Sequence, residues 1–127
     1  MRGVHTEVTE AAIDALVRRF YGAVRQDAVL GPIFERAIDD WDEHFDRLTD
    51  FWSSVMLGSG RYKGNPFGAH QPLRLGPGMF MRWLGLWRSA TEELFVPDIA
   101  AEFQAKADRI ARSLMLGLFG PGLVRAG

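Results

Sequence analysis

The sequence contains no cysteine among its 127 residues. This absence excludes a disulfide framework, thiolate catalysis, cysteine-type zinc sites and cysteine-bound iron–sulfur clusters. Any metal that the protein binds must therefore be held by histidine or carboxylate side chains.

Long apolar runs are absent as well. No stretch approaches the roughly 20 consecutive apolar residues that a membrane-spanning helix requires. The first residues also lack a basic segment followed by an apolar one, which is the pattern of a secretory signal. We therefore expect no association with a membrane and a location in the cytoplasm.

Neither sign of charge dominates. The 15 lysine and arginine residues nearly balance the 16 aspartate and glutamate residues, which gives a formal net charge of -1. Proteins that bind nucleic acid carry clustered basic side chains that neutralise phosphates, and no such cluster occurs in this sequence. Nucleic acid is therefore not expected as a partner.

Apolar and aromatic residues, by contrast, are abundant. Hydrophobic residues make up 47% of the chain and aromatic residues 12%, including four tryptophans and nine phenylalanines. A chain of this length and composition encloses one real core. We expect a single domain over residues 1–127, with flexible ends at about residues 1–7 and 120–127.

Apolar side chains recur every three or four residues in most of the chain, which predicts helices. The first helix is expected over about residues 9–27, followed by a short proline-started turn at Leu30–Phe34. Later helices are expected from a cap at Asp39–Asp40 to Gly58, around Phe80–Leu94, and from a cap at Asp98 to Gly120. No alternating strand pattern and no internal repeat occurs, so the predicted fold class is all-α.

The segment Gly58–Gly78 differs from the rest because it holds six glycines and three prolines. At about 20 residues it is too long for an idle connection in a compact domain. We expect it to wrap around something.

Two histidines lie in aromatic surroundings. His44 falls on the apolar face of the predicted 41–58 helix, and His70 lies in the glycine- and proline-rich segment. Together with the adjacent Phe20 and Tyr21 on another apolar face, they describe a pocket for a flat ligand with iron at its centre, because neutral imidazole commonly binds iron. One imidazole would bind the metal and the other would face whatever binds opposite.

Each of these residues taken singly has a more ordinary interpretation. His44 alone is more often a core histidine bonded to protein, His70 alone a solvent-exposed loop residue, and Tyr21 alone a core tyrosine whose hydroxyl reaches the surface or a backbone carbonyl. Trp83 alone indicates packing. The helices could also form a bundle filled by its own aromatic side chains, and periodicity does not decide between these alternatives.

Several ordered blocks at matching spacings resemble the third group of the truncated haemoglobin family. The blocks are Phe20–Tyr21, Leu30–Phe34, Trp41–His44, Asp50–Trp52, Tyr62–Gly64, Ala69–His70 and Arg82–Leu84. The likeness runs from Phe20 to about Trp87. The other two groups typically carry Gly-Gly pairs beside their helices, and this sequence has none.

The resemblance implies a truncated globin in which two helices pack across two others with haem b (iron protoporphyrin IX) between them. It makes His70 the iron ligand and places Tyr21, His44 and Trp83 on the opposite, distal side. The haem pocket implied by the resemblance comprises Phe20, Phe34, Leu48, Trp52, Tyr62 and Phe80. Arg61 and Arg74 are candidates for the haem propionates, or equally for solvated surface charges.

The function implied by the resemblance is reversible binding of dioxygen, carbon monoxide, nitric oxide and related diatomic ligands at five-coordinate iron, as in oxygen transport. Donors on the distal side would strengthen the binding of a ligand that carries partial negative charge. An enzyme remains an alternative, with nitric oxide dioxygenation or peroxidase-like activity, His44 as acid–base group and a reductase as partner. A cofactor-free helical interaction module is the third possibility.

The chain departs from the family pattern at two positions. Met79 stands where a histidine often precedes the block at 80–84, and Trp87 replaces a more usual phenylalanine. Neither residue is expected to bind iron, but both alter the fit expected around the haem edge.

Overall fold

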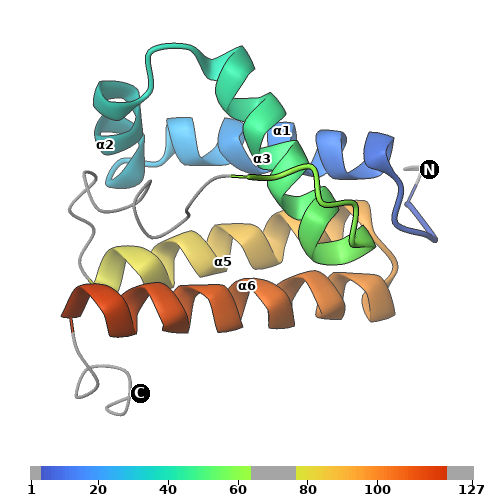
Figure 1. The fold of residues 1–127 in the computed structure, drawn as a ribbon. Helices are drawn as coiled ribbons and strands as arrows, with labels where there is room; N and C mark the ends of the chain where they lie inside the picture. Colours follow the sequence, from blue (N-terminus) through green and yellow to red (C-terminus); the bar gives the residue numbers. More distant parts are fainter. Residues whose placement is uncertain (1–3, 64–76, 120–127) are drawn as a thin grey trace.

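The computed structural model describes residues 4–63 and 77–119. Five helices occur in this part of the chain: α1 (Glu10–Gln26), α2 (Leu30–Ala37), α3 (Trp41–Leu57), α5 (Pro77–Leu94) and α6 (Pro97–Phe119) (Figure 1). These ranges contain no strand, and the predicted all-α class is confirmed. None of the helices so described has both the length and the apolarity to cross a bilayer.

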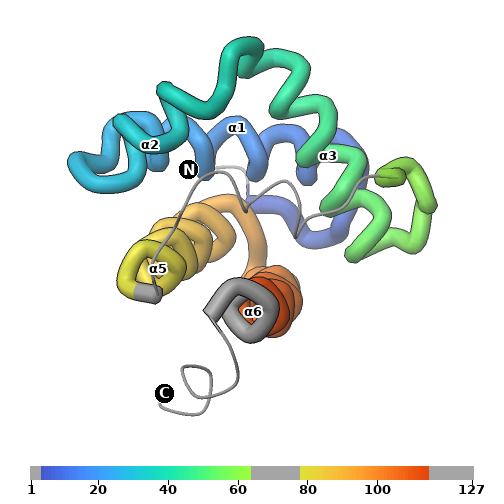
Figure 2. The backbone as a smooth tube through the Cα atoms, turned by 60° about the vertical axis from the view of Figure 1, so that its left-hand side comes forward, coloured from blue at the N-terminus to red at the C-terminus, as the bar shows by residue number. Residues whose placement is uncertain are grey.

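The helices form two crossed pairs. α1 packs against α3, α5 packs against α6, and contact between α1 and α5 joins the pairs, while α2 packs beside α1. Figure 2 shows α5 and α6 nearly end-on beneath the layer made by α1, α2 and α3. The expected arrangement of two helices across two others is therefore confirmed.

The first helix supplies most of the centre of the molecule. It begins where predicted, because the hydroxyl of Thr9 accepts a hydrogen bond from the backbone N–H of Ala12 (3.1 Å) and caps the helix. Its inward face is fully apolar apart from one phenol hydroxyl, and consists of Ala12, Ile13, Leu16, Val17, Phe20, Tyr21 and Val24. Burial of this face against three neighbouring helices fixes the direction in which Tyr21 points.

The second helix begins at Leu30, as the sequence predicted, and continues to Ala37, beyond the predicted end at Phe34. This start lies two residues before Pro32, and the carboxylate of Asp27 accepts the backbone N–H groups of Val29 (3.0 Å) and Leu30 (2.9 Å) there. Gly31 allows the tight approach to α1, since a Cβ there would lie 2.6 Å from the backbone oxygen of Arg25. Pro32 lies within the first turn of α2, where its missing N–H is tolerated, so the expectation that the proline starts this helix is wrong.

The caps of the later helices agree with the sequence in one case and differ in another. The carboxylate of Asp40 caps α3, and Gly58 ends it with φ 66°, both as predicted. The last helix, however, begins at Pro97, so the expected cap at Asp98 is wrong. Proline fits this first position because its missing N–H is not needed there, and Asp98 instead places negative charge in the first turn.

The N-terminal segment contacts the end of α5 through His5. Its backbone N–H donates to the carbonyl of Leu94 (2.8 Å), and its carbonyl accepts from Val96 (3.1 Å). The imidazole also lies 5.4 Å from the ring of Phe95. The expected flexibility of residues 1–7 stays a prediction, and residues 120–127 lie outside the described part.

Candidate functional site

Three side chains that the resemblance places on one side of the haem meet in the structure. Tyr21 comes from α1, His44 from α3 and Trp83 from α5. The Tyr21 and His44 rings are 5.2 Å apart and nearly perpendicular. The ring of Phe20 contacts both Tyr21 and Trp83, with ring centroids 4.7 and 5.1 Å away. The crossing of α1 with α3 and α5 is what brings these side chains together.

Trp41 extends this group at the start of α3. Its ring lies 5.7 Å from His44 and 6.0 Å from Tyr21. The guanidinium of Arg25 covers it at 4.4 Å from the ring centroid, and an ion pair with Glu35 (2.7 Å) holds that guanidinium. We call Tyr21, Trp41, His44 and Trp83 the donor cluster, since each side chain carries an N–H or O–H group.

The Tyr21 hydroxyl stays protonated. Only 3% of this residue is exposed, and burial raises the pKa of the Tyr21 hydroxyl far above its usual value because the charged form loses hydration. The nearby N–H of Trp83 offsets a small part of that rise. At any ordinary pH, Tyr21 is therefore a neutral O–H donor inside an apolar wall.

Two indole N–H groups in the donor cluster are buried without an acceptor. Neither Trp41 Nε1 nor Trp83 Nε1 has a hydrogen-bond partner among the described residues; Trp83 lies beside the Tyr21 hydroxyl, but not in hydrogen-bonding geometry. A buried donor left unsatisfied costs about 1–3 kcal/mol. Within the described part of the chain, the cluster therefore fits a bound group that supplies hydrogen-bond acceptors.

Trp83 is positioned by a contact at the end of α1. The guanidinium of its neighbour Arg82 donates to both carboxylate oxygens of Asp27, at 2.8 and 2.7 Å. This hydrogen-bonded ion pair holds the pKa of Asp27 below its usual value. The same carboxylate accepts backbone N–H groups at the start of α2, so one side chain connects α1, α2 and α5 beside the donor cluster.

Comparison with known proteins agrees with this geometry. A family model described as bacterial-like globin matches residues 8–114. The chain belongs to the bacterial-like globin family. In sequence it is 32% identical over 109 residues to a group 3 truncated hemoglobin of Campylobacter jejuni, covering 82% of this chain and 86% of that protein. In structure it matches the crystal structure of group III truncated hemoglobin from Campylobacter jejuni with a TM-score of 0.85 and 30% identity, covering 91% and 95% of the two chains.

The likeness to the third group of truncated haemoglobins is thereby confirmed. The protein is a globin, and its general function is to bind haem and a ligand at the haem. For this family, diatomic gases such as oxygen are the ligands implied. The buried, unpartnered indole donors described above suit such a ligand.

The residues expected to form the haem pocket of this globin do not all lie beside the donor cluster. Phe34 is buried, with its ring 5.8 Å from Tyr21, and lies with Phe20 beside the donor cluster. Trp52 lies farther along α3 and stacks on Trp87 at 4.5 Å, and the half-buried Tyr62 packs on Phe51 at 5.1 Å. Phe80 is buried and Leu48 is partly buried against the same core.

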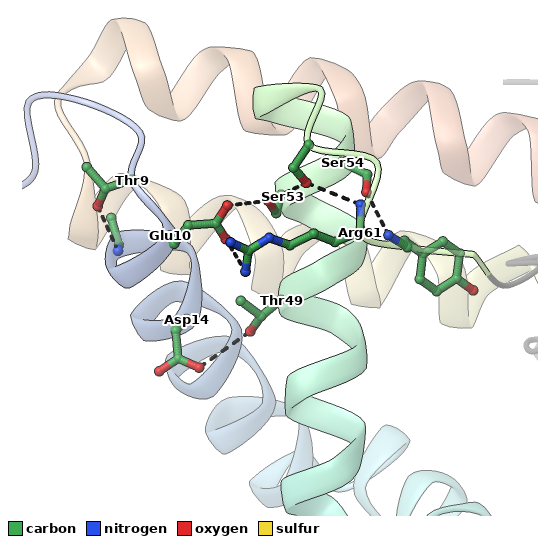
Figure 3. A network of polar contacts seen from close by, with 10 residues as sticks. Thr9, Glu10, Asp14, Thr49, Ser53, Ser54 and Arg61 are labelled. Atoms are coloured by element: carbon green, nitrogen blue, oxygen red, sulfur yellow. Dashed lines mark hydrogen bonds and ion pairs between the residues drawn. The ribbon is translucent and has the colours of Figure 1, made fainter.

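Arg61 has a carboxylate partner within the globin itself. Its guanidinium lies 3.8 Å from Glu10, whose other oxygen accepts the hydroxyl of Ser53 (2.5 Å), and Ser53 shares a hydrogen bond with Ser59 (2.7 Å). Figure 3 shows this network between α1, α3 and the segment that follows α3. A haem propionate that binds Arg61 would have to compete with Glu10, and the assignment of Arg61 to a propionate stays a prediction.

Two predicted residues cannot be placed. His70, the expected iron ligand, and Arg74, the second propionate candidate, lie outside the described residues. Sequence reasoning also missed Trp41 as a member of the donor cluster. Its position three residues before His44 puts both side chains on one helix face, which was the available signal.

Proposed function

We propose that this globin binds dioxygen reversibly at haem b, with His70 as the iron ligand and the donor cluster on the opposite side. The observation that carries the proposal is the buried N–H of Trp83, which has no acceptor in the described part and lies beside the protonated hydroxyl of Tyr21. Carbon monoxide and nitric oxide would occupy the same place. Phe20, Phe34 and Phe80 would form the apolar wall of the haem pocket, and Arg61 and Arg74 are the candidates for the haem propionates.

Haem, when bound, supplies an iron atom that coordinates a diatomic gas. The chain supplies the surroundings of that gas. Trp83 offers an N–H and Tyr21 an O–H, and both are neutral, so they interact most strongly with a ligand that carries partial negative charge. Because both groups lie in a buried, low-dielectric setting, each hydrogen bond is stronger than it would be in water. The expected result is slow release of oxygen.

The experiment is an absorption spectrum of the expressed protein under reducing conditions, with and without carbon monoxide. We expect a haem spectrum that shifts when carbon monoxide is added. His70→Ala should lose the spectrum of the wild type, whereas His5→Ala, which changes a histidine of the N-terminal segment beside the end of α5, should keep it. An unchanged spectrum in His70→Ala would contradict the assignment of the iron ligand.

A second candidate function is redox catalysis, either nitric oxide dioxygenation or peroxide activation. The observation that favours it is the half-buried position of His44, whose ring lies 5.2 Å from that of Tyr21. An imidazole at this position is placed to act as an acid–base group toward a ligand bound beside Tyr21. Nitric oxide consumption with a reductase present should show turnover that His44→Gln reduces. Without turnover, the protein would be a carrier or sensor.

A further inference from the structure

The indole of Trp41 carries a donor that the binding of a diatomic gas does not use. Its Nε1 atom is buried and has no hydrogen-bond partner among the described residues. A buried N–H without an acceptor destabilises the folded protein, and an acceptor bound in the same place removes that cost. In the proposed function the gas accepts hydrogen bonds from Trp83 and Tyr21, so the N–H of Trp41 has no role there.

Trp41 and Trp83 belong to different parts of the donor cluster. Trp41 comes from α3, where its ring lies 5.7 Å from that of His44 and 6.0 Å from that of Tyr21. Trp83 comes from α5, and its ring lies 5.1 Å from that of Phe20. The cluster therefore offers buried N–H groups from two helices, in two places.

The number of atoms in a ligand decides whether it can serve both places. A diatomic ligand that binds iron through one atom has a single outer atom, which accepts from the donors nearest to it. A triatomic anion has one atom more, so it extends farther into the cluster. It also carries a full negative charge, and hydrogen bonds to a charged acceptor are shorter and stronger than those to a neutral one.

The charges around Trp41 suit an anion. The guanidinium of Arg25 lies 4.4 Å from the centroid of its ring, and an ion pair with Glu35 (2.7 Å) holds that guanidinium in place. A cation over the face of an indole attracts the electrons of the ring, which makes the N–H a better donor. Tyr21 stays protonated, and no member of the donor cluster has a carboxylate, so no negative charge within the cluster opposes an anion.

We propose that Trp41 selects triatomic anions of the azide and nitrite class as ligands of this globin, by donating its N–H to the atom of the anion farthest from the iron. This role rests on the proposed binding of haem beside the donor cluster. Trp83 and Tyr21 would serve the middle atom of such an anion, which corresponds to the outer atom of a diatomic ligand. Trp41 therefore distinguishes ligands by their length.

Anion titrations of the ferric, haem-loaded protein test this role. Azide and nitrite are the triatomic probes, and cyanide is the matched control because it has the same charge and one atom fewer. In Trp41→Phe the dissociation constants of azide and nitrite should rise by about 10- to 150-fold, the effect of one hydrogen bond to a charged group, and that of cyanide should change little. Trp83→Phe should weaken the binding of all three anions. An unchanged azide affinity in Trp41→Phe, or an equal loss for azide and cyanide, would overturn the proposal.

A measurement on the wild type keeps the test valid should Trp41→Phe fail to fold. The ultraviolet resonance Raman band that reports hydrogen bonding of the indole N–H is compared between the azide and cyanide complexes. One more indole N–H should be hydrogen-bonded in the azide complex, and identical bands would overturn the proposal.

Two controls separate the possible failures. A sample whose reduced form lacks a carbon monoxide spectrum shows that haem binding itself has failed, whereas a normal spectrum with equal azide binding in the wild type and Trp41→Phe refutes the role of Trp41 alone. Transfer of haem to apomyoglobin is measured in the same two proteins. Faster transfer from Trp41→Phe with unchanged azide binding would show that the N–H serves a haem propionate, and it would likewise overturn the proposal.

Discussion

Replacing Trp83 by phenylalanine should change the stability of the haem-free protein and the release of oxygen in different ways. Phenylalanine keeps a ring against Phe20, which lies 5.1 Å away, but removes an N–H that is buried without a partner among the described residues. In the haem-free protein, removing such a donor relieves a cost of about 1–3 kcal/mol, which offsets the contact area lost. Its free energy of unfolding should therefore change little.

The loaded protein should respond more strongly to the same change. A hydrogen bond from Trp83 to a ligand with partial negative charge contributes about 1.5–3 kcal/mol. Since each 1.4 kcal/mol is a factor of ten, the oxygen dissociation rate should rise by about 10- to 150-fold. Stopped-flow measurement of oxygen release and urea unfolding of the haem-free protein give the two quantities.

The matched control is Trp87→Phe. The N–H of Trp87 already donates to the carbonyl of Phe103 (3.2 Å), so this variant loses a satisfied hydrogen bond worth about 0.5–1.5 kcal/mol as well as contact area. It should destabilise the haem-free protein more than Trp83→Phe does and leave oxygen release nearly unchanged. If Trp83→Phe instead destabilised the haem-free protein by several kcal/mol and did not alter oxygen release, Trp83 would be a packing residue and the reasoning would be refuted.

Three further predictions concern the contacts around the site. The hydrogen-bonded ion pair with Arg82 lowers the pKa of Asp27. Its contribution to stability is therefore present above the unfolded pKa of about 3.9 and is lost as pH falls through the lower folded value. Urea unfolding at several pH values should show this loss in the wild type and not in Asp27→Asn, and equal acid sensitivity of the two proteins would contradict the prediction. Gly31→Ala should destabilise by about 1–3 kcal/mol in thermal unfolding, because its Cβ would lie 2.6 Å from a backbone oxygen; a neutral result would show that the α1–α2 turn relaxes. Ser53→Ala removes the hydroxyl that Glu10 accepts and should cost about 1–3 kcal/mol in urea, with Ser89→Ala on the exposed face of α5 as a control of no effect.

The sequence predicted those features of the fold that depend on neighbouring residues. Regular apolar spacing gave the helices, and Asp40 and Gly58 marked two of their ends correctly because a cap acts within one turn. For α2 the predicted start at Leu30 is right, but the role given to proline is wrong, because the helix begins two residues before Pro32, where the carboxylate of Asp27 accepts the N–H of Leu30. The prediction also failed at Asp98, because Pro97 occupies the first helical position.

The functional site, like the fold, could be predicted only in part. Tyr21 and His44 could be assigned to one pocket from their places on apolar helix faces, but Trp83 could be added only through the family likeness. Contacts that depend on the crossing of helices could not be predicted: the cover of Arg25 over Trp41 and the stack through Trp87 are examples. Such contacts are set by the packing angle between helices, for which a single sequence carries no local pattern.

The central claim is that the donor cluster directs its N–H and O–H groups at a ligand on the haem. The most direct test is the C–O stretching frequency of carbon monoxide bound to the reduced protein, because nearby donors weaken the C–O bond and lower that frequency. We expect a low frequency in the wild type that rises in Trp83→Phe and rises further when Tyr21→Phe is added. A frequency that stays the same in all three proteins would contradict the claim.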